Sequence, residues 1–126
     1  MTDSDLDVLG VAQYLLLTTF RRDGRAVPTP LWVARDGDAL VVWTPAGSGK
    51  VKRLRNRADV TVAPCTYSGE PTGPSLVGTA TVLDPEASRA GKALIRRKYG
   101  VMGILTMTGS RIRRGSRGTV CIRITI

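Results

Sequence analysis

Residues 14–34 read YLLLTTFRRDGRAVPTPLWVA, two apolar segments on either side of a short polar one. The apolar segments, Tyr14–Phe20 and Val27–Ala34, contain the β-branched and aromatic residues that favour strands. Asp23-Gly24 lies between them and is a typical turn of a β-hairpin. The stretch therefore predicts two antiparallel strands joined by a tight turn.

The second of these strands carries Pro28 and Pro30, which cannot donate a backbone hydrogen bond. We therefore expect this strand at a sheet edge or with a bulge. Two interpretations stay open. The prolines leave neighbouring backbone groups available to a flat heteroaromatic ring, or they protect the edge against aggregation.

The rest of the chain consists of strand-like runs and three helical segments. A second Asp-Gly turn leads from Val27–Ala34 into a third strand, so the first three strands form a meander. The further strands are predicted over Ala39–Thr44, Asp59–Thr66, Leu76–Leu83 and Thr119–Ile126. Helices are predicted over Asp5–Val11, over Lys50–Ala58, and from the N-cap Asp84 to about Tyr99, where Gly100 ends the helix.

These elements predict a mainly β fold with flanking helices. Six antiparallel strands with helices at the edges favour a small barrel in a single domain over residues 1–126. The segment Val101–Ile112 fits no single element. Cys65 and Cys121 lie in apolar, strand-like runs, so we expect buried thiols rather than a disulfide or a metal site.

Charge and composition restrict the function classes. The 126 residues include 19 basic and 10 acidic side chains, a net charge of +9, so an anionic partner is expected. Histidine is absent, which excludes Ser-His-Asp and Cys-His catalysis and histidine metal ligands. If the protein is an enzyme, a cofactor therefore carries its chemistry. A polar N-terminus and no long apolar run predict a cytoplasmic protein without a membrane segment.

The densest local signal is a basic helix. No acidic residue interrupts its five basic positions, which are Lys50, Lys52, Arg53, Arg55 and Arg57. Ser48 and Gly49 precede it, and a hydroxyl, a lysine and the free amides of a first helical turn suit a phosphate. The alternative is a solvated basic helix. A nucleotide P-loop is rejected, because Thr44 and Val51 stand where that motif needs glycine and serine or threonine.

A second basic run, Arg111–Gly118, contains four arginines in seven residues. It could grip phosphates or nucleic acid, but a solvated loop is the simpler interpretation. Aromatic residues make up only 5% of the chain and do not alternate with exposed basic residues. Binding of single-stranded nucleic acid is therefore not expected.

Taken in order, these segments resemble a known family. Tyr14–Phe20, the Asp23-Gly24-Arg25 turn, Pro28–Val33 and the helix start Gly49–Leu54 are similar in order and spacing to the pyridoxamine 5′-phosphate oxidase-like split β-barrel family. Within it the chain most resembles the small F420-dependent oxidoreductases, over nearly its whole length. The resemblance implies a six-stranded split barrel of the FMN-binding type that forms a homodimer, with cofactor sites at the subunit interface.

The resemblance also implies where the cofactor binds. In this family the segment leading into the first crossover helix holds the cofactor phosphate, which here assigns Thr44, Ser48, Lys50, Val51, Lys52 and Arg53. The strand matching Pro28, Thr29 and Pro30 lies against the ring system. Gly49, argued from the helix start alone, completes the phosphate site. The basic cluster favours the deazaflavin coenzyme F420, with its anionic oligoglutamate tail, over FMN.

The resulting hypothesis is hydride transfer between reduced F420 and a small organic substrate. The alternatives are an FMN-dependent oxidoreductase, a cofactor carrier without turnover, and a basic nucleic-acid module. No catalytic side chain is identified, and Tyr67, a candidate proton donor, is better explained by packing. Larger family members oxidise pyridoxamine phosphate with a further C-terminal segment. The sequence stops at Ile126, so that activity is not expected here.

Overall fold

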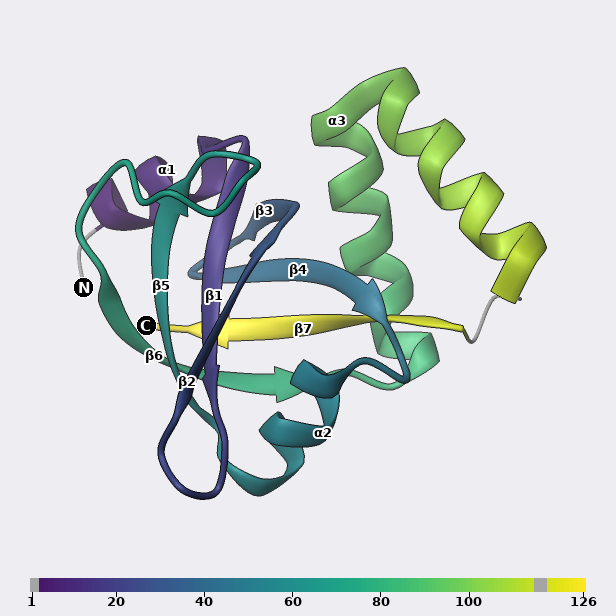
Figure 1. The fold of residues 1–126 in the computed structure, drawn as a ribbon. Coiled ribbons are helices and arrows are strands. Elements are labelled where there is room, and N and C mark those ends of the chain that lie inside the picture. The colour runs from purple at the N-terminus through teal and green to yellow at the C-terminus, as the bar shows by residue number, and fades with distance from the viewer. Residues whose placement is uncertain (1–2, 115–117) are drawn as a thin grey trace.

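The computed structural model describes residues 3–114 and 118–126, and side chains for 4–100 and 118–126. Its elements follow one another along the chain (Figure 1). They are α1 (Asp3–Val11), β1 (Tyr14–Phe20), β2 (Ala26–Leu31), β3 (Val33–Asp36), β4 (Ala39–Pro45), α2 (Gly49–Asn56), β5 (Asp59–Cys65), β6 (Leu76–Val82), α3 (Pro85–Arg114) and β7 (Thr119–Thr125).

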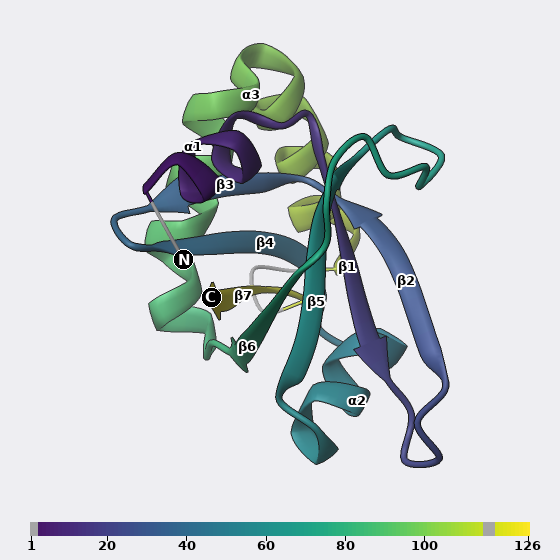
Figure 2. The same ribbon diagram turned by 90° about the vertical axis from the view of Figure 1, so that its left-hand side faces the viewer.

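One antiparallel sheet contains all seven of these strands, in the order β2-β1-β5-β6-β7-β4-β3. The two edge strands, β2 and β3, are consecutive along the chain and are separated only by Trp32. Because one bent segment supplies both edges, the sheet curls on itself into a barrel (Figures 1 and 2). The predicted mainly β, antiparallel barrel with flanking helices is confirmed.

The strand count and the meander were predicted wrongly, for one physical reason. Val27–Ala34 is not a single strand between two neighbours. Its first part pairs with β1, where Leu16 lies opposite Pro30, and its second part pairs with β4, where Val33 lies opposite Val42. At the break, the backbone N–H of Val33 donates to the Tyr99 hydroxyl at 3.0 Å instead of to a neighbouring strand.

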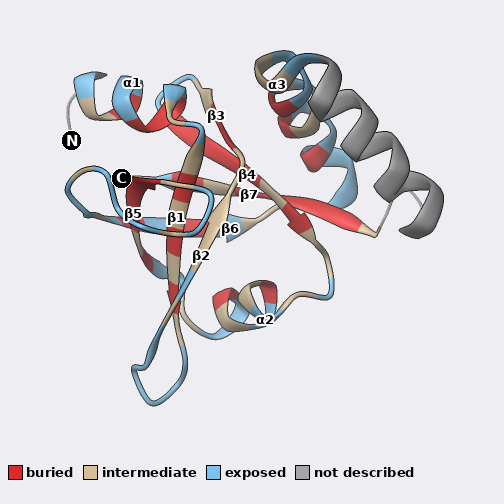
Figure 3. Ribbon diagram, turned by 45° about the horizontal axis from the view of Figure 1, so that its top comes forward, coloured by how far each residue is buried: buried red, intermediate tan, exposed pale blue. Residues whose placement is uncertain are grey.

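The barrel interior holds the main core. β1 alternates half-buried and buried residues along its length (Figure 3), and its buried leucines, Leu15 and Leu17, belong to the core cluster. This cluster consists of Leu6, Leu9, Leu15, Leu17, Val33, Leu40, Val42, Leu54, Val60, Val62, Ala80, Ile122 and Ile124. Cys65 and Cys121 are buried, free thiols, as the sequence predicted.

The long helix α3 covers the outside of the barrel over β3, β4 and β7 (Figure 1). A smaller cluster of Ala34, Val41 and Ile95 seals this contact, with Trp32 and Trp43 packed against it. Gly100 breaks the helix with φ of 61° and ψ of −139°, as its glycine suggested. The helix then resumes to Arg114, so the ambiguous segment is helical. Arg111–Arg114 is therefore not a loop, and residues 115–117 of that basic run lie outside the described residues.

The short helix α2 lies across one end of the barrel, next to β1 and β6 (Figure 2). Val51 and Leu54 are its buried residues and anchor it to the barrel. Within the described part of the chain, no helix is long and apolar enough to span a membrane. The same residues contain no group of three or more side chains that could hold a metal ion.

Candidate functional site

The start of α2 brings hydroxyl groups to the end of β4. Thr44 is the buried penultimate residue of β4, and a tight turn follows in which Ser48 N–H donates to the Pro45 carbonyl at 3.2 Å. Ser48 is the N-cap of α2, but its side chain makes no capping hydrogen bond. Its Oγ lies 3.4 Å from Thr44 Oγ1 instead. The first-turn amides of α2 have no helical partner and stay available to an anion.

Arg53 reaches back over this helix start. Its Nε donates to Thr19 Oγ1 at 2.7 Å, and Thr19 is buried on β1. The rest of the guanidinium lies against Gly49, where an added Cβ would be only 2.8 Å from Nη1. Gly49 therefore lets the cationic end of Arg53 lie beside the first-turn amides.

Lys50 adds a second positive charge that is half-buried. Burial lowers the pKa of its ammonium, and the nearby charge of Arg53 lowers that pKa further. The pKa of Arg53 is also lowered, by burial and then by the charge of Arg21. Burial is the main cause of both shifts, the neighbouring cation adds to each, and no acidic group raises the pKa of either side chain.

No carboxylate among the described residues pairs with Lys50 or Arg53. The contrast with other arginines is informative, because Arg35 pairs with Asp7 and Arg57 with Asp59. We call Thr44, Ser48, Gly49, Lys50 and Arg53 the anion cradle. Two partly desolvated cations without an acid, beside two hydroxyls and free amides, form a site that an anion would stabilise.

Two residues predicted to bind the phosphate, Val51 and Lys52, have side chains outside the anion cradle. The side chain of Val51 is 1% exposed and packs into the core, so only its backbone N–H can face a ligand. Lys52 is exposed beside the cradle, and its carbonyl accepts from Asn56 Nδ2 at 3.3 Å. It can act on an anion only through solvent, where a charge contributes little to affinity.

The residues predicted to lie against the cofactor ring are on the strand next to the cradle. Pro28, Thr29 and Pro30 are in β2, which pairs only with β1. Val27 at the start of β2 lies opposite Thr19, the residue that accepts from Arg53. Because proline cannot donate to the ladder, the prolines turn their carbonyls to the unpaired edge. That edge offers acceptors to an N–H donor of a flat ring.

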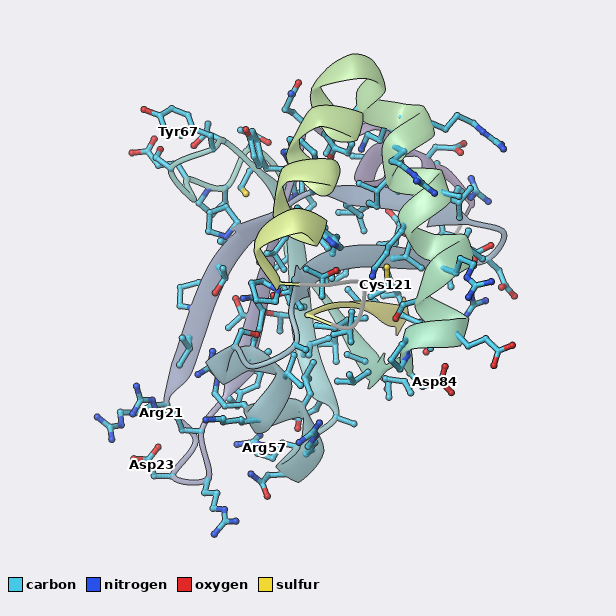
Figure 4. The ribbon with its side chains drawn as sticks, turned by 90° about the vertical axis from the view of Figure 1, so that its right-hand side faces the viewer. Arg21, Asp23, Arg57, Tyr67, Asp84 and Cys121 are labelled. Carbon is cyan, nitrogen blue, oxygen red and sulfur yellow. The ribbon has the colours of Figure 1, made fainter. Side chains whose placement is uncertain are left out.

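Other sequence candidates are placed away from the cradle. The Arg57 guanidinium, 5.0 Å from the centroid of the Phe20 ring and paired with Asp59, stabilises the fold. Tyr67 is 78% exposed, so the packing expected for it is wrong. Its loop lies at the other end of the barrel from α2, whereas Arg21 lies at the α2 end (Figure 4).

Sequence reasoning missed Thr19 and Arg21. Both lie near α2 because the sheet brings the end of β1 next to that helix, and neither belongs to a sequence motif. From the sequence alone, a threonine near the end of an alternating strand is interpreted as an ordinary core residue. Only the hydrogen bond from Arg53 shows its part in the cradle.

The family model described as pyridoxamine 5′-phosphate oxidase matches residues 1–126. No curated protein matches the chain.

Solved structures share its fold at low sequence identity. A conserved hypothetical protein from Mycobacterium tuberculosis is 22% identical with a TM-score of 0.70, over 98% of this chain and 79% of that one. An F420 reductase is 18% identical with a TM-score of 0.61, over 94% and 90%. A FAD and heme binding protein from Mycobacterium smegmatis is 20% identical with a TM-score of 0.65, over 100% and 66%.

Proposed function

Since the chain belongs to the pyridoxamine 5′-phosphate oxidase family, we propose that it is an F420-dependent oxidoreductase. It would transfer hydride between the reduced deazaflavin coenzyme and a small organic substrate. The observation that carries this proposal is the anion cradle, where Lys50 and Arg53 lack an acidic partner in the described structure.

The cradle fits a cofactor phosphate. Lys50, the guanidinium of Arg53, the Ser48 hydroxyl and the amides at Gly49 and Val51 would hold the phosphate oxygens. The unpaired edge of β2 at Pro28, Thr29 and Pro30 would lie along the ring. Exposed cations beyond the cradle, Lys52 and Arg21, would attract the oligoglutamate tail.

The chemistry would come from the cofactor, which supplies the hydride when bound and reduced. The protein's own residues bind, orient and exclude water from the ring. We assign the lysine and the arginine of the cradle to binding the phosphate, and we assign no proton donor among the cradle residues.

FMN is the second candidate cofactor, because its phosphate suits the same cradle. A titration of the cofactor-free protein with F420 and with FMN, followed by fluorescence, separates the two. Tight and selective F420 binding supports the proposal, and preference for FMN replaces it with a flavin-dependent oxidoreductase. Binding of F420 without oxidation of F420H2 by any acceptor would indicate a carrier.

Lys50→Ala tests the cradle directly. We expect F420 affinity to fall by roughly 1.5–3 kcal/mol, about 10- to 150-fold, because a charge-assisted hydrogen bond to the phosphate is lost. Arg55→Ala is the matched control, since it removes an exposed charge from the same helix outside the cradle. Equal losses in both variants would mean that the helix attracts the cofactor only by its total charge.

A homodimer is part of the proposal, because the family resemblance implies cofactor sites between subunits. Val77 on β6 is 74% exposed, an apolar side chain on the outer face of the sheet that a second subunit could cover. Sedimentation equilibrium of the purified protein is expected to give twice the chain mass of 13.5 kDa. A monomer at concentrations where F420 still binds would remove this part.

A further inference from the structure

A pocket of about 520 Å³ lies at the opposite end of β1 and β2 from the anion cradle. Its lining includes Gln13 and Tyr14 before and at the start of β1, Trp32 at the strand break, and Lys98 and Tyr99 near the end of the first part of α3. The register separates the two places, because Leu15 pairs with Leu31 at this end and Thr19 with Val27 at the other. The volume is in the range of small-molecule sites.

Lys98 brings a positive charge into this pocket. Its Nζ donates to the carbonyls of Ala12 at 2.5 Å and Val33 at 2.6 Å. Burial lowers the pKa of this amine to about 8, with no acidic group acting on it. Two backbone carbonyls fix its position, but a lysine has three donors and its charge stays without a counter-ion among the described residues.

The pocket wall is aromatic and held rigidly. The Trp32 and Tyr99 rings stack with centroids 4.3 Å apart and planes 7° apart. The Tyr99 hydroxyl donates to the Gln13 carbonyl at 2.7 Å and accepts from Val33 N–H. Lys98 Nζ lies 4.9 Å from the centroid of the Tyr99 ring, so the ammonium and the stacked rings belong to one surface.

Two features together define a ligand. A half-buried ammonium without an acid favours an anion, and rigid stacked rings favour a flat apolar body. The hydrogen bonds of Lys98 and Tyr99 to the backbone explain how these two side chains stabilise the strand break. They do not account for an uncompensated charge beside an open pocket.

We propose that this pocket is a second ligand site, separate from the anion cradle, that takes a planar aromatic carboxylate. The carboxylate would accept from the remaining N–H of Lys98, and its ring would lie against the Trp32–Tyr99 wall. This inference does not depend on which cofactor binds at the cradle.

A comparison of 2-naphthoate with the neutral 2-naphthamide tests the proposal on the whole chain. Both probes have the same ring system, so a difference in affinity measures the contribution of the charge. Isothermal titration at pH 7 is expected to show about tenfold tighter binding of the carboxylate. Equal affinities, or no binding of either probe, would overturn the proposal without any variant being made.

Variants then locate the site. Lys98→Met is expected to abolish the preference for the carboxylate, whereas Lys50→Met, at the cradle, is expected to leave it unchanged. Since Lys98→Met could destabilise the strand break, Lys98→Arg is the second variant and should retain the preference. If the preference disappears in Lys50→Met and survives in Lys98→Met, the carboxylate binds in the cradle and the proposal fails.

The fluorescence of Trp32 provides an independent test of the proposed site. The chain has two tryptophans, so Trp43→Phe leaves Trp32 as the only indole. Binding of 2-naphthoate is expected to change the fluorescence of this variant, because the ring lies against Trp32. Binding by calorimetry without any change in Trp32 fluorescence would place the probe elsewhere.

Discussion

The guanidinium of Arg53 makes two different contacts. Its Nε is held by the buried Thr19 hydroxyl, which fixes the guanidinium, and its far end lies against Gly49. A charged group that is positioned before the ligand arrives loses less conformational entropy on binding. The cradle therefore depends as much on the missing side chain at position 49 as on the charges around it.

Gly49→Ala is expected to separate binding from stability. The new Cβ would lie 2.8 Å from Arg53 Nη1, the end of a flexible side chain that can move away. We expect the free energy of unfolding in urea to stay within about 1 kcal/mol, because alanine favours the helix while Arg53 loses its place. Cofactor affinity is expected to fall about tenfold.

Gly47→Ala is the control for this change. An added Cβ at position 47 would meet no atom within 4 Å, although the residue is only two positions before Gly49. Both its stability and its affinity are expected to match the original protein. Full affinity in Gly49→Ala would show that the position of Arg53 does not matter.

Among the elements, the break between β2 and β3 at Trp32 could not be predicted from the sequence. The run Val27–Ala34 has strand composition throughout, so a single strand was the natural prediction. Lys98 and Tyr99 form hydrogen bonds with the backbone of Val33 at the break, although they are more than 60 positions away in the sequence. No local pattern reports such partners. By contrast, β1 and α2 were predictable because their apolar periodicity lies within each element.

Tyr99→Phe tests this long-range support. Without the hydroxyl, Val33 N–H and the Gln13 carbonyl lose their partner at the break. We expect the free energy of unfolding to fall by about 1–3 kcal/mol, the range for a polar group left unsatisfied. Urea unfolding measures it, with Tyr67→Phe, whose hydroxyl is exposed, as a control expected to change nothing. Equal stability of both variants would mean that water replaces the Tyr99 hydroxyl.

For the whole molecule, the sequence predicted the barrel and the helix start that forms the cradle. Ser48, Gly49 and Lys50 stand together in the chain, so their proximity needs no fold to establish it. Thr19, near the end of β1, and Arg21, just after it, approach α2 only through the sheet order and could not be predicted. The pocket at Lys98 depends on how α3 packs against the strand break, which no local pattern shows.

Stability should change with pH through Lys98. Its folded pKa of about 8 is below the ordinary value of 10.5. Between these values the unfolded chain binds the proton and the folded protein does not, so stability from this group rises as pH increases from about 8 to 10.5. Burial raises the pKa of Cys121 from 9.0 to about 11, which acts in the opposite direction over the upper part of this range.

Comparison with Lys98→Met isolates the effect, because Cys121 is present in both proteins and cancels. Urea unfolding at several pH values is expected to show the original protein gaining on the variant above pH 8. A difference between the two proteins that is constant from pH 7 to 10.5 would contradict the lowered pKa of Lys98.

The place of β7 in the sheet has a consequence for the order of events during synthesis. β7 follows every other strand in the chain, yet it pairs with both β6 and β4, with Thr44 opposite Val120. Until β7 has left the ribosome, β4 and β6 each keep an open edge, and the two hairpins of the N-terminal half can form but cannot join into a barrel. Pairings between residues so far apart in the chain form slowly. The nascent protein therefore remains an open sheet until β7 emerges, and during that interval we expect a chaperone that covers exposed strand edges to protect it from aggregation.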